Sequence, residues 1–344
     1  MLTIRWTQAI GTGTGVLVYR LVPSRRRVAR INIRQAYPDY DEAQIRALNI
    51  ASFKNLGISV FEFAQAWWRD RDYMRSICKV EGRHHLDTAL AEGKGVILLT
   101  GHFTTLEIGA MLIGLYTPLN GVYKKAHNPM FNAFMAHYRS TYGEELIENK
   151  NVRALIRGLR KGRATWFAPD QDFSEQDIVF TPFLGGIAST LTATARMAEM
   201  TGAKVVPFYP VRLDRGQGYK LVILPALEDF PSDDIEKDSA RINKAIEAVD
   251  TSMSGLEDEA ASLLDEHMNE TAAPNYFYSL LGDLSADNPE TALEWHRLAF
   301  EGSSHGSARV KWGAAYLPVI KIQMYAKGKT LDRGFSVPQD RQER

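Results

Sequence analysis

In residues 84–224, short apolar runs typical of strands alternate with segments whose apolar residues have helical spacing, and this pattern predicts the fold class. The run VILLT at 96–100 is almost continuously apolar, which is typical of a strand buried on both faces. Further strands are predicted at 121–123, 164–168, 203–209 and 219–224, and helices at 84–91, 104–115, 129–142, 152–161 and 191–201. Strands that alternate with helices predict an α/β fold with a mostly parallel central sheet flanked by helices.

The first 68 residues show no strand pattern. Residues 41–68 have apolar side chains at helical spacing behind a capping Asp41, although Gly57 weakens the prediction of one continuous helix. The uncharged stretch 6–19 is shorter than the roughly 20 apolar residues that cross a bilayer, and no signal-peptide cleavage site follows it. Its three closely spaced glycines do not fit a dinucleotide-binding fingerprint, so we interpret them as flexible or loosely packed backbone. The stretch can instead lie in a membrane interface.

The pattern changes again after residue 250. Residues 251–273 are acidic and poor in strand signals, and helices are predicted at 276–282, 290–301 and 307–326. Three regions follow from these patterns: a basic N-terminal arm (1–38), an α/β domain (39–250) and a helical C-terminal region of unassigned role (251–344).

Charge is distributed unevenly between these regions. The 344 residues contain 41 basic and 41 acidic side chains, and this balance argues against a wholly basic nucleic-acid binder. Residues 1–38 nevertheless contain seven arginines and no acid, while residues 251–344 contain 14 acids and nine bases. The arm favours contact with an anionic surface, membrane phospholipid or nucleic acid, and a solvated helix face is the alternative. The single Cys78 excludes an internal disulfide and a cysteine-based zinc cluster.

Candidate catalytic residues follow the first buried strand. His102 comes directly after strand 96–100, and Glu107 lies in the first turns of the next helix. A carboxylate that holds one imidazole nitrogen leaves the other nitrogen to take a proton from an alcohol. A His and a Glu at this spacing are also common by chance, and a metal site is disfavoured because the HExxH spacing is absent.

A second polar cluster, Asp170-Gln171-Asp172, follows the strand at 164–168. Because sites in such sheets lie at the carboxyl ends of strands, we expect His102 and Asp170 to converge. The two acids form either a solvated turn or an active-site loop that orders a basic residue or the substrate. Two basic groups remain: Tyr123-Lys124-Lys125 at the end of a strand could face an anionic head group, and Arg153, Arg157 and Arg160 are interpreted as a solvated helix face.

The segment GVILLTGHFTTLEIGA at 95–110 resembles the HX4D/E box of the bacterial late acyltransferases of lipid A biosynthesis, the lauroyl/myristoyl transferase family. Similar blocks occur in the family's order at 18–32, 80–86, 123–129, 166–172, 180–183 and 188–208, so the resemblance covers roughly residues 4–248. The box alone is shared with glycerolipid acyltransferases. An acyltransferase for another glycolipid or a lysophospholipid, and a non-catalytic membrane-docked scaffold, therefore remain alternatives.

The resemblance implies a glycerolipid-acyltransferase-like fold and a mechanism without metal, nucleotide or other cofactor. His102 would be the general base toward a hydroxyl of a lipid A precursor, Glu107 would orient it, and the hydroxyl would attack the thioester of an acyl-acyl carrier protein. Lys124 would bind phosphate or stabilise the oxyanion. The remaining family positions implied to bind substrate are Tyr123, Asn128, Arg153, Asp170 and Asp172.

The resemblance also implies a place in the cell, the cytoplasmic face of the bacterial inner membrane, and no nucleic-acid partner. The apolar start of this chain is shorter than the family's membrane anchor, so we expect peripheral or weak attachment to the anionic membrane surface. Residues 251–344 match nothing in the family pattern.

Overall fold

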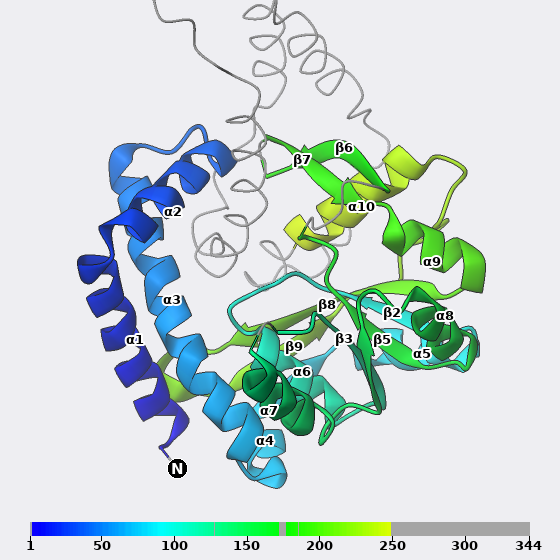
Figure 1. Ribbon diagram of the computed structural model, residues 1–344, viewed down its shortest axis with the longest axis horizontal. Helices are drawn as coiled ribbons and strands as arrows, with labels where there is room; N and C mark the ends of the chain where they lie inside the picture. Colours follow the sequence, from blue (N-terminus) through cyan, green and yellow to red (C-terminus); the bar gives the residue numbers. More distant parts are fainter. Residues whose placement is uncertain (1, 127, 172–176, 185, 249–344) are drawn as a thin grey trace, which may run out of the picture.

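The computed structural model describes residues 2–126, 128–171, 177–184 and 186–248. At its centre lies a seven-stranded sheet of order β1-β9-β8-β2-β5-β3-β4, with helices on both faces (Figure 1). The strands are β1 (Cys78–Glu81), β2 (Val96–Leu99), β3 (Leu119–Tyr123), β4 (Glu145–Glu148), β5 (Ala164–Phe167), β8 (Lys204–Arg212) and β9 (Tyr219–Ile223). Every neighbouring pair is parallel except β8 and β9. The predicted α/β class with a mostly parallel sheet is confirmed.

Two apolar layers, one on each face of the sheet, enclose β2. Ile97 and Leu99 pack in one layer, and Val96 and Leu98 pack in the other. This alternation explains the continuous apolar run, because a strand covered on both faces has no polar side. The helices are α1 (Ile4–Leu21), α2 (Pro23–Ala36), α3 (Glu42–Trp68), α4 (Arg71–Ser76), α5 (Arg83–Ala91), α6 (Leu106–Gly114), α7 (Pro129–Arg139), α8 (Val152–Arg160), α9 (Ala193–Thr201) and α10 (Ile235–Glu247).

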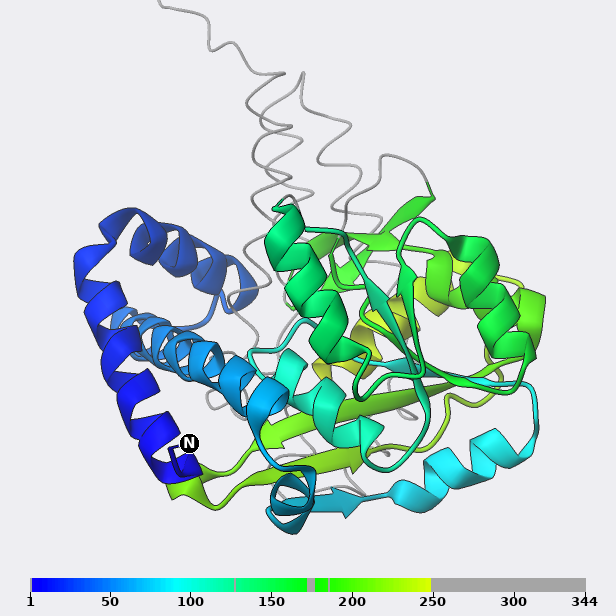
Figure 2. The same cartoon turned by 60° about the horizontal axis from the view of Figure 1, so that its bottom comes forward.

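Helices α1, α2 and α3 lie together at one side of the sheet, as two views show (Figures 1 and 2). Helix α3 is continuous through Gly57 and begins at a capping box of Asp41 and Gln44. The interpretation of the N-terminal glycines as loose backbone is wrong for Gly11 and Gly15. A Cβ on Gly15 would lie 2.1 Å from the Phe53 carbonyl oxygen, so these glycines allow the backbones of α1 and α3 to touch.

Four strands are absent from the predicted pattern. The edge strands β1 and β4 have four residues each and few buried side chains, which is too short for a recognisable period. The other two, β6 (Ile178–Phe183) and β7 (Gly186–Leu191), pair as an antiparallel hairpin outside the main sheet. The helices predicted in residues 276–326 lie outside the described residues.

Candidate active site

The carboxyl ends of β2 and β5 bring two distant polar segments together. The strands run in parallel and in register, with Leu99 opposite Phe167, and the Thr100 amide donates to the Phe167 carbonyl at 3.1 Å. Beyond these positions, the segments that follow β2 and β5 leave the sheet at the same edge. His102 and Asp170 therefore start from neighbouring strand ends, as the sequence predicts.

Asp170 holds His102 through both of its carboxylate oxygens. One oxygen accepts the backbone N–H of His102 at 2.9 Å, and the other lies 2.7 Å from Nδ1 of the imidazole. The Asp170 side chain is fully buried, whereas the His102 side chain is 31% exposed. A carboxylate at Nδ1 favours the tautomer with the proton on that nitrogen, which leaves Nε2 with a lone pair for a substrate proton.

Glu107 belongs to a different cluster. It lies in the first turn of α6 and is 3% exposed. Its carboxylate accepts hydrogen bonds from Trp67 Nε1 at 2.8 Å and from the Tyr142 hydroxyl at 2.6 Å, and the guanidinium of Arg139 donates to both oxygens at 2.6–3.2 Å. These contacts join the start of α6 to α3 and to the end of α7.

The charges in this cluster stabilise one another. Burial alone raises the pKa of Glu107, but the hydrogen bonds and positive charge of Arg139, together with Tyr142 and Trp67, bring that pKa below its ordinary value. Burial and the Glu107 carboxylate raise the pKa of Tyr142, so its hydroxyl stays protonated and can donate. Glu107 is thus a carboxylate fixed in its ionised form.

The sequence predicts that Glu107 holds the imidazole of His102. In the structure, Asp170 occupies the position at Nδ1 instead. The reason is the direction of the Glu107 side chain: α6 begins at Leu106, and its first turn directs Glu107 toward Arg139, whose side chain is 18% exposed. The buried Glu107 carboxylate and the partly buried guanidinium each need a counter-charge, and each supplies it to the other. No local spacing in the sequence links Glu107 to Arg139, Tyr142 or Trp67, so these partners are not predicted from the sequence.

The other candidate residues lie along the same edge of the sheet. Tyr123 ends β3, which is separated from β2 by β5. At a spacing of about 4.8 Å between strands, Tyr123 and the following Lys124 begin roughly 10 Å from the end of β2. Asn128 caps α7, because its side chain accepts the Phe131 amide at 3.1 Å. A local structural role therefore accounts for Asn128.

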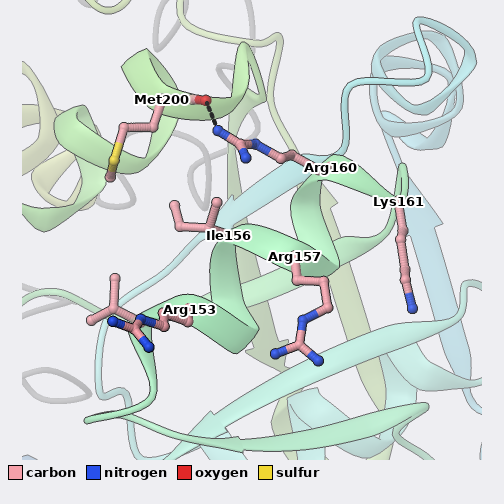
Figure 3. A pocket seen from close by; sticks show the side chains of 7 residues that line it. Arg153, Ile156, Arg157, Arg160, Lys161 and Met200 are labelled. Atoms are coloured by element: carbon pink, nitrogen blue, oxygen red, sulfur yellow. Dashed lines mark hydrogen bonds between the residues drawn. The ribbon is translucent and has the colours of Figure 1, made fainter.

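Arg153 lies at the start of α8, beyond the carboxyl end of the edge strand β4. It lines a hollow of about 480 Å³ with Ile156, Arg157 and Met200 (Figure 3). Asp172 lies outside the described residues. Within the described ranges, no group of three or more His, Cys, Asp or Glu side chains could hold a metal ion. Among those same residues, no helix is both long and apolar enough to cross a bilayer.

Comparison with known proteins agrees with this arrangement. Residues 1–251 match the family described as bacterial lipid A biosynthesis acyltransferase. The chain is 34% identical over 240 residues to a lipid A biosynthesis lauroyltransferase of Escherichia coli K12. The aligned residues cover 69% of this chain and 78% of that protein. It is 31% identical over 243 residues to a lipid A biosynthesis acyltransferase of Haemophilus influenzae (69% and 77%), and 29% identical over 240 residues to a palmitoleoyltransferase of E. coli K12 (69% and 78%). The family match over residues 1–251 and a relative with 34% identity over 69% of the chain show that the chain belongs to the bacterial lipid A biosynthesis acyltransferases.

Proposed function

We propose that this acyltransferase moves a fatty acyl chain from an acyl-acyl carrier protein to a hydroxyl of a lipid A precursor, with His102 as the general base. The contact between His102 Nδ1 and the buried Asp170 carries the proposal, because it occupies Nδ1 and leaves Nε2 as the proton acceptor on a side chain that is 31% exposed. The substrates named for the relatives, which transfer lauroyl and palmitoleoyl groups in lipid A biosynthesis, support the acceptor class.

The reaction needs one proton shuttle. Nε2 of His102 takes the proton from the acceptor hydroxyl as its oxygen attacks the thioester carbonyl carbon. The tetrahedral intermediate collapses, the carbon–sulfur bond breaks, and the imidazolium returns the proton to the leaving thiolate. Asp170 orients the imidazole and stabilises its positive charge during the cycle. The products are an ester and a free carrier thiol.

Glu107 acts on this reaction indirectly, as a positioning residue. Its bonds to Arg139, Tyr142 and Trp67 fix the start of α6, and α6 begins four residues after His102. The N-terminal side of that helix is also held by Thr105, whose hydroxyl donates to the Pro210 carbonyl at 2.7 Å. The loop that carries His102 is therefore anchored at both ends, by Asp170 and by the Glu107 cluster.

A phosphorylated acceptor fits the cations along the same edge. Lys124 directly follows β3, whose end lies roughly 10 Å from the end of β2, and Arg153 lies farther along the edge, at the start of α8 beyond β4. These separations suit binding of a phosphate on the acceptor better than stabilisation of an oxyanion next to His102. The cation positions thus support a large anionic acceptor rather than a small alcohol.

A membrane location is supported by the exposed side of α1. Trp6, Ile10, Leu17 and Leu21 are 40–69% exposed and recur at helical spacing, opposite the side that packs on α3. Exposed apolar side chains beside the arginines of α2 are typical of a helix that lies in the membrane interface. The proposed location is the cytoplasmic face of the bacterial inner membrane, where the precursor and the acyl carrier meet.

The catalytic proposal is tested with purified protein, acyl-acyl carrier protein and a lipid A precursor. His102→Ala should lower the transfer rate by about 10²–10⁴-fold while the circular dichroism spectrum and melting temperature stay unchanged. His137→Ala, a change on α7, is the control and should keep the wild-type rate. A folded His102→Ala protein with the wild-type rate would exclude His102 as the base.

The acceptor is tested separately by mass spectrometry of lipid A from a strain that lacks this protein. We expect lipid A with one acyl chain fewer, and the missing mass gives the length of the transferred chain. An unchanged number of acyl chains would refute the lipid A acceptor. Another glycolipid or a lysophospholipid would then be the next acceptor to assay.

A further inference from the structure

The outer side of α8 carries an unusual excess of positive charge. Residues 149–169 contain six lysines and arginines and no acidic residue. Five of the six are exposed, and within the described part of the chain Arg153, Arg157 and Lys161 have no carboxylate within salt-bridge distance. Arg163 differs, because it pairs with Glu144 and Glu145 at 2.8 and 3.0 Å. We call Arg153, Arg157 and Lys161 the α8 cation row.

The α8 cation row lies beside apolar side chains that face the same hollow. Val152 and Met200 are each 49% exposed and line the hollow together with Ile156, which lies near Met200 in Figure 3. Arg160 points toward α9 and donates to the Met200 carbonyl at 3.2 Å. A surface with unpaired cations next to exposed apolar groups fits a peptide segment with both acidic and apolar residues better than it fits a free inorganic anion.

The same chain contains a segment with the opposite charge. Residues 251–296 contain ten acidic residues and no lysine or arginine. Leucines and a methionine lie among these acids, as in the run EDEAASLLDEHMNE at 257–270. The family match ends at residue 251, so the proposed transferase function leaves this segment without a role.

The acidic segment can reach the α8 cation row from its attachment point. Glu257 follows Glu247, the last residue of α10, by ten positions, which an extended chain covers in about 33 Å. Helix α9 packs against both α8 and α10. Packed helix axes are about 8–10 Å apart, so the axis of α8 lies within roughly 20 Å of the axis of α10.

We propose that the acidic segment 251–296 binds the α8 cation row of its own chain. Because the segment is tethered, its effective concentration at α8 is in the range of about 1 mM, and weak individual contacts suffice for binding. The bound segment neutralises Arg153, one of the cations at the edge of the active site, and covers the apolar hollow.

Zero-length cross-linking of the purified full-length chain tests this proposal. A carbodiimide joins a lysine amine to a carboxylate only where the two are in contact, and it is consumed as the urea. At low salt we expect peptides that join Lys161 to acids of residues 257–294. Their yield should fall strongly near 1 M salt, where the screening length shortens from about 10 Å to about 3 Å. Lys79, exposed on the far edge strand β1, is the internal control and should give no such products.

Two further measurements make the result decisive. Arg157→Glu should lower the yield at Lys161 by about fivefold or more, because it places a like charge in the row, whereas Arg46→Glu, a matched change on α3, should not. A mixture of isotope-labelled and unlabelled protein should give cross-links within single chains only. The proposal is overturned if Lys161 gives no product in the pure protein, if Lys79 reacts equally, or if the products join different chains.

Discussion

At the scale of single residues, the sequence offers two carboxylates near His102, and in the structure one of them contacts its imidazole. Asp170 contacts Nδ1, whereas Glu107 is bound to Arg139. Asp170→Asn places an amide at Nδ1 and removes the charge that stabilises the imidazolium. We expect kcat to fall by about 10²–10⁴-fold with the fold retained, measured by steady-state acyl transfer and thermal melting. Wild-type turnover in a folded Asp170→Asn protein would mean that Asp170 does not orient the base.

Glu107→Gln should act first on stability. The change leaves the partly buried Arg139 guanidinium without its counter-charge, which costs on the order of 3 kcal/mol. Glu144→Gln, which removes a partly exposed partner of Arg163, is the control and should cost less than about 1 kcal/mol. Urea denaturation at neutral pH measures both. Equal free energies of unfolding for the two variants would contradict the buried ion pair.

The contribution of Glu107 should also depend on pH in a defined direction. Because its folded-state pKa is lowered, Glu107 stabilises the fold at pH values above its unfolded pKa of about 4.3, and this contribution is lost as the pH falls through the folded-state pKa. The gap in unfolding free energy between wild type and Glu107→Gln should therefore be largest near neutral pH and shrink below about pH 4. A gap that stays constant from pH 7 to 3 would show that packing, and not charge, explains the loss.

The sequence predicts the meeting of His102 and Asp170 but not the partner of Glu107, and the difference has a physical basis. Strand ends in a parallel sheet share one edge, so two residues that each follow a buried strand are placed by the topology alone. The direction of the Glu107 side chain depends instead on where α6 begins and on a guanidinium 32 positions away. Contacts of that kind are set by tertiary packing and leave no local pattern.

At the scale of elements, the long buried strands and the amphipathic helices follow from periodicity, whereas close helix contacts do not. The same three glycines fit both a flexible segment and a tight helix pair, and only the position of α3 decides between them. Gly57 lies against Gly11 and Gly15, where a Cβ would be 2.1 Å from the Gly11 carbonyl oxygen. A Cβ on Gly13 of α1 would meet no other atom within 4 Å, so Gly13 is the control position for a glycine outside the contact.

Gly57→Ala should separate α1 from α3, because the added methyl would overlap backbone atoms that cannot move independently. We expect a loss of about 1–3 kcal/mol in unfolding free energy. Gly13→Ala should instead stabilise by about 0.5–1 kcal/mol, through higher helix propensity at a position with free space. Proteolysis near residue 21 should accelerate in Gly57→Ala alone. Equal stability of the two variants would contradict the close packing of α1 on α3.

At the scale of the whole molecule, the net charge of zero is the sum of regions of opposite charge, and the proposed membrane contact involves the basic region. The apolar side of α1 and the arginines of α2 should bind anionic vesicles by two separable contributions. Arg25→Ala/Arg27→Ala removes two exposed cations without described carboxylate partners, and at about 1 kcal/mol each the binding constant should fall roughly 30-fold at low salt.

Salt distinguishes the two contributions. Near 1 M salt the charge term is screened, so the double arginine variant and wild type should bind alike, whereas Trp6→Glu/Leu17→Glu should bind more weakly than wild type at every salt concentration because burial of apolar area is lost. Phe180→Glu on β6 introduces an acid at a similarly exposed apolar position and should leave binding unchanged. If Phe180→Glu weakens binding as much as Trp6→Glu/Leu17→Glu, the contact is a general effect of surface charge. If only the α1 variant loses binding, the exposed side of α1 is the face that enters the bilayer surface.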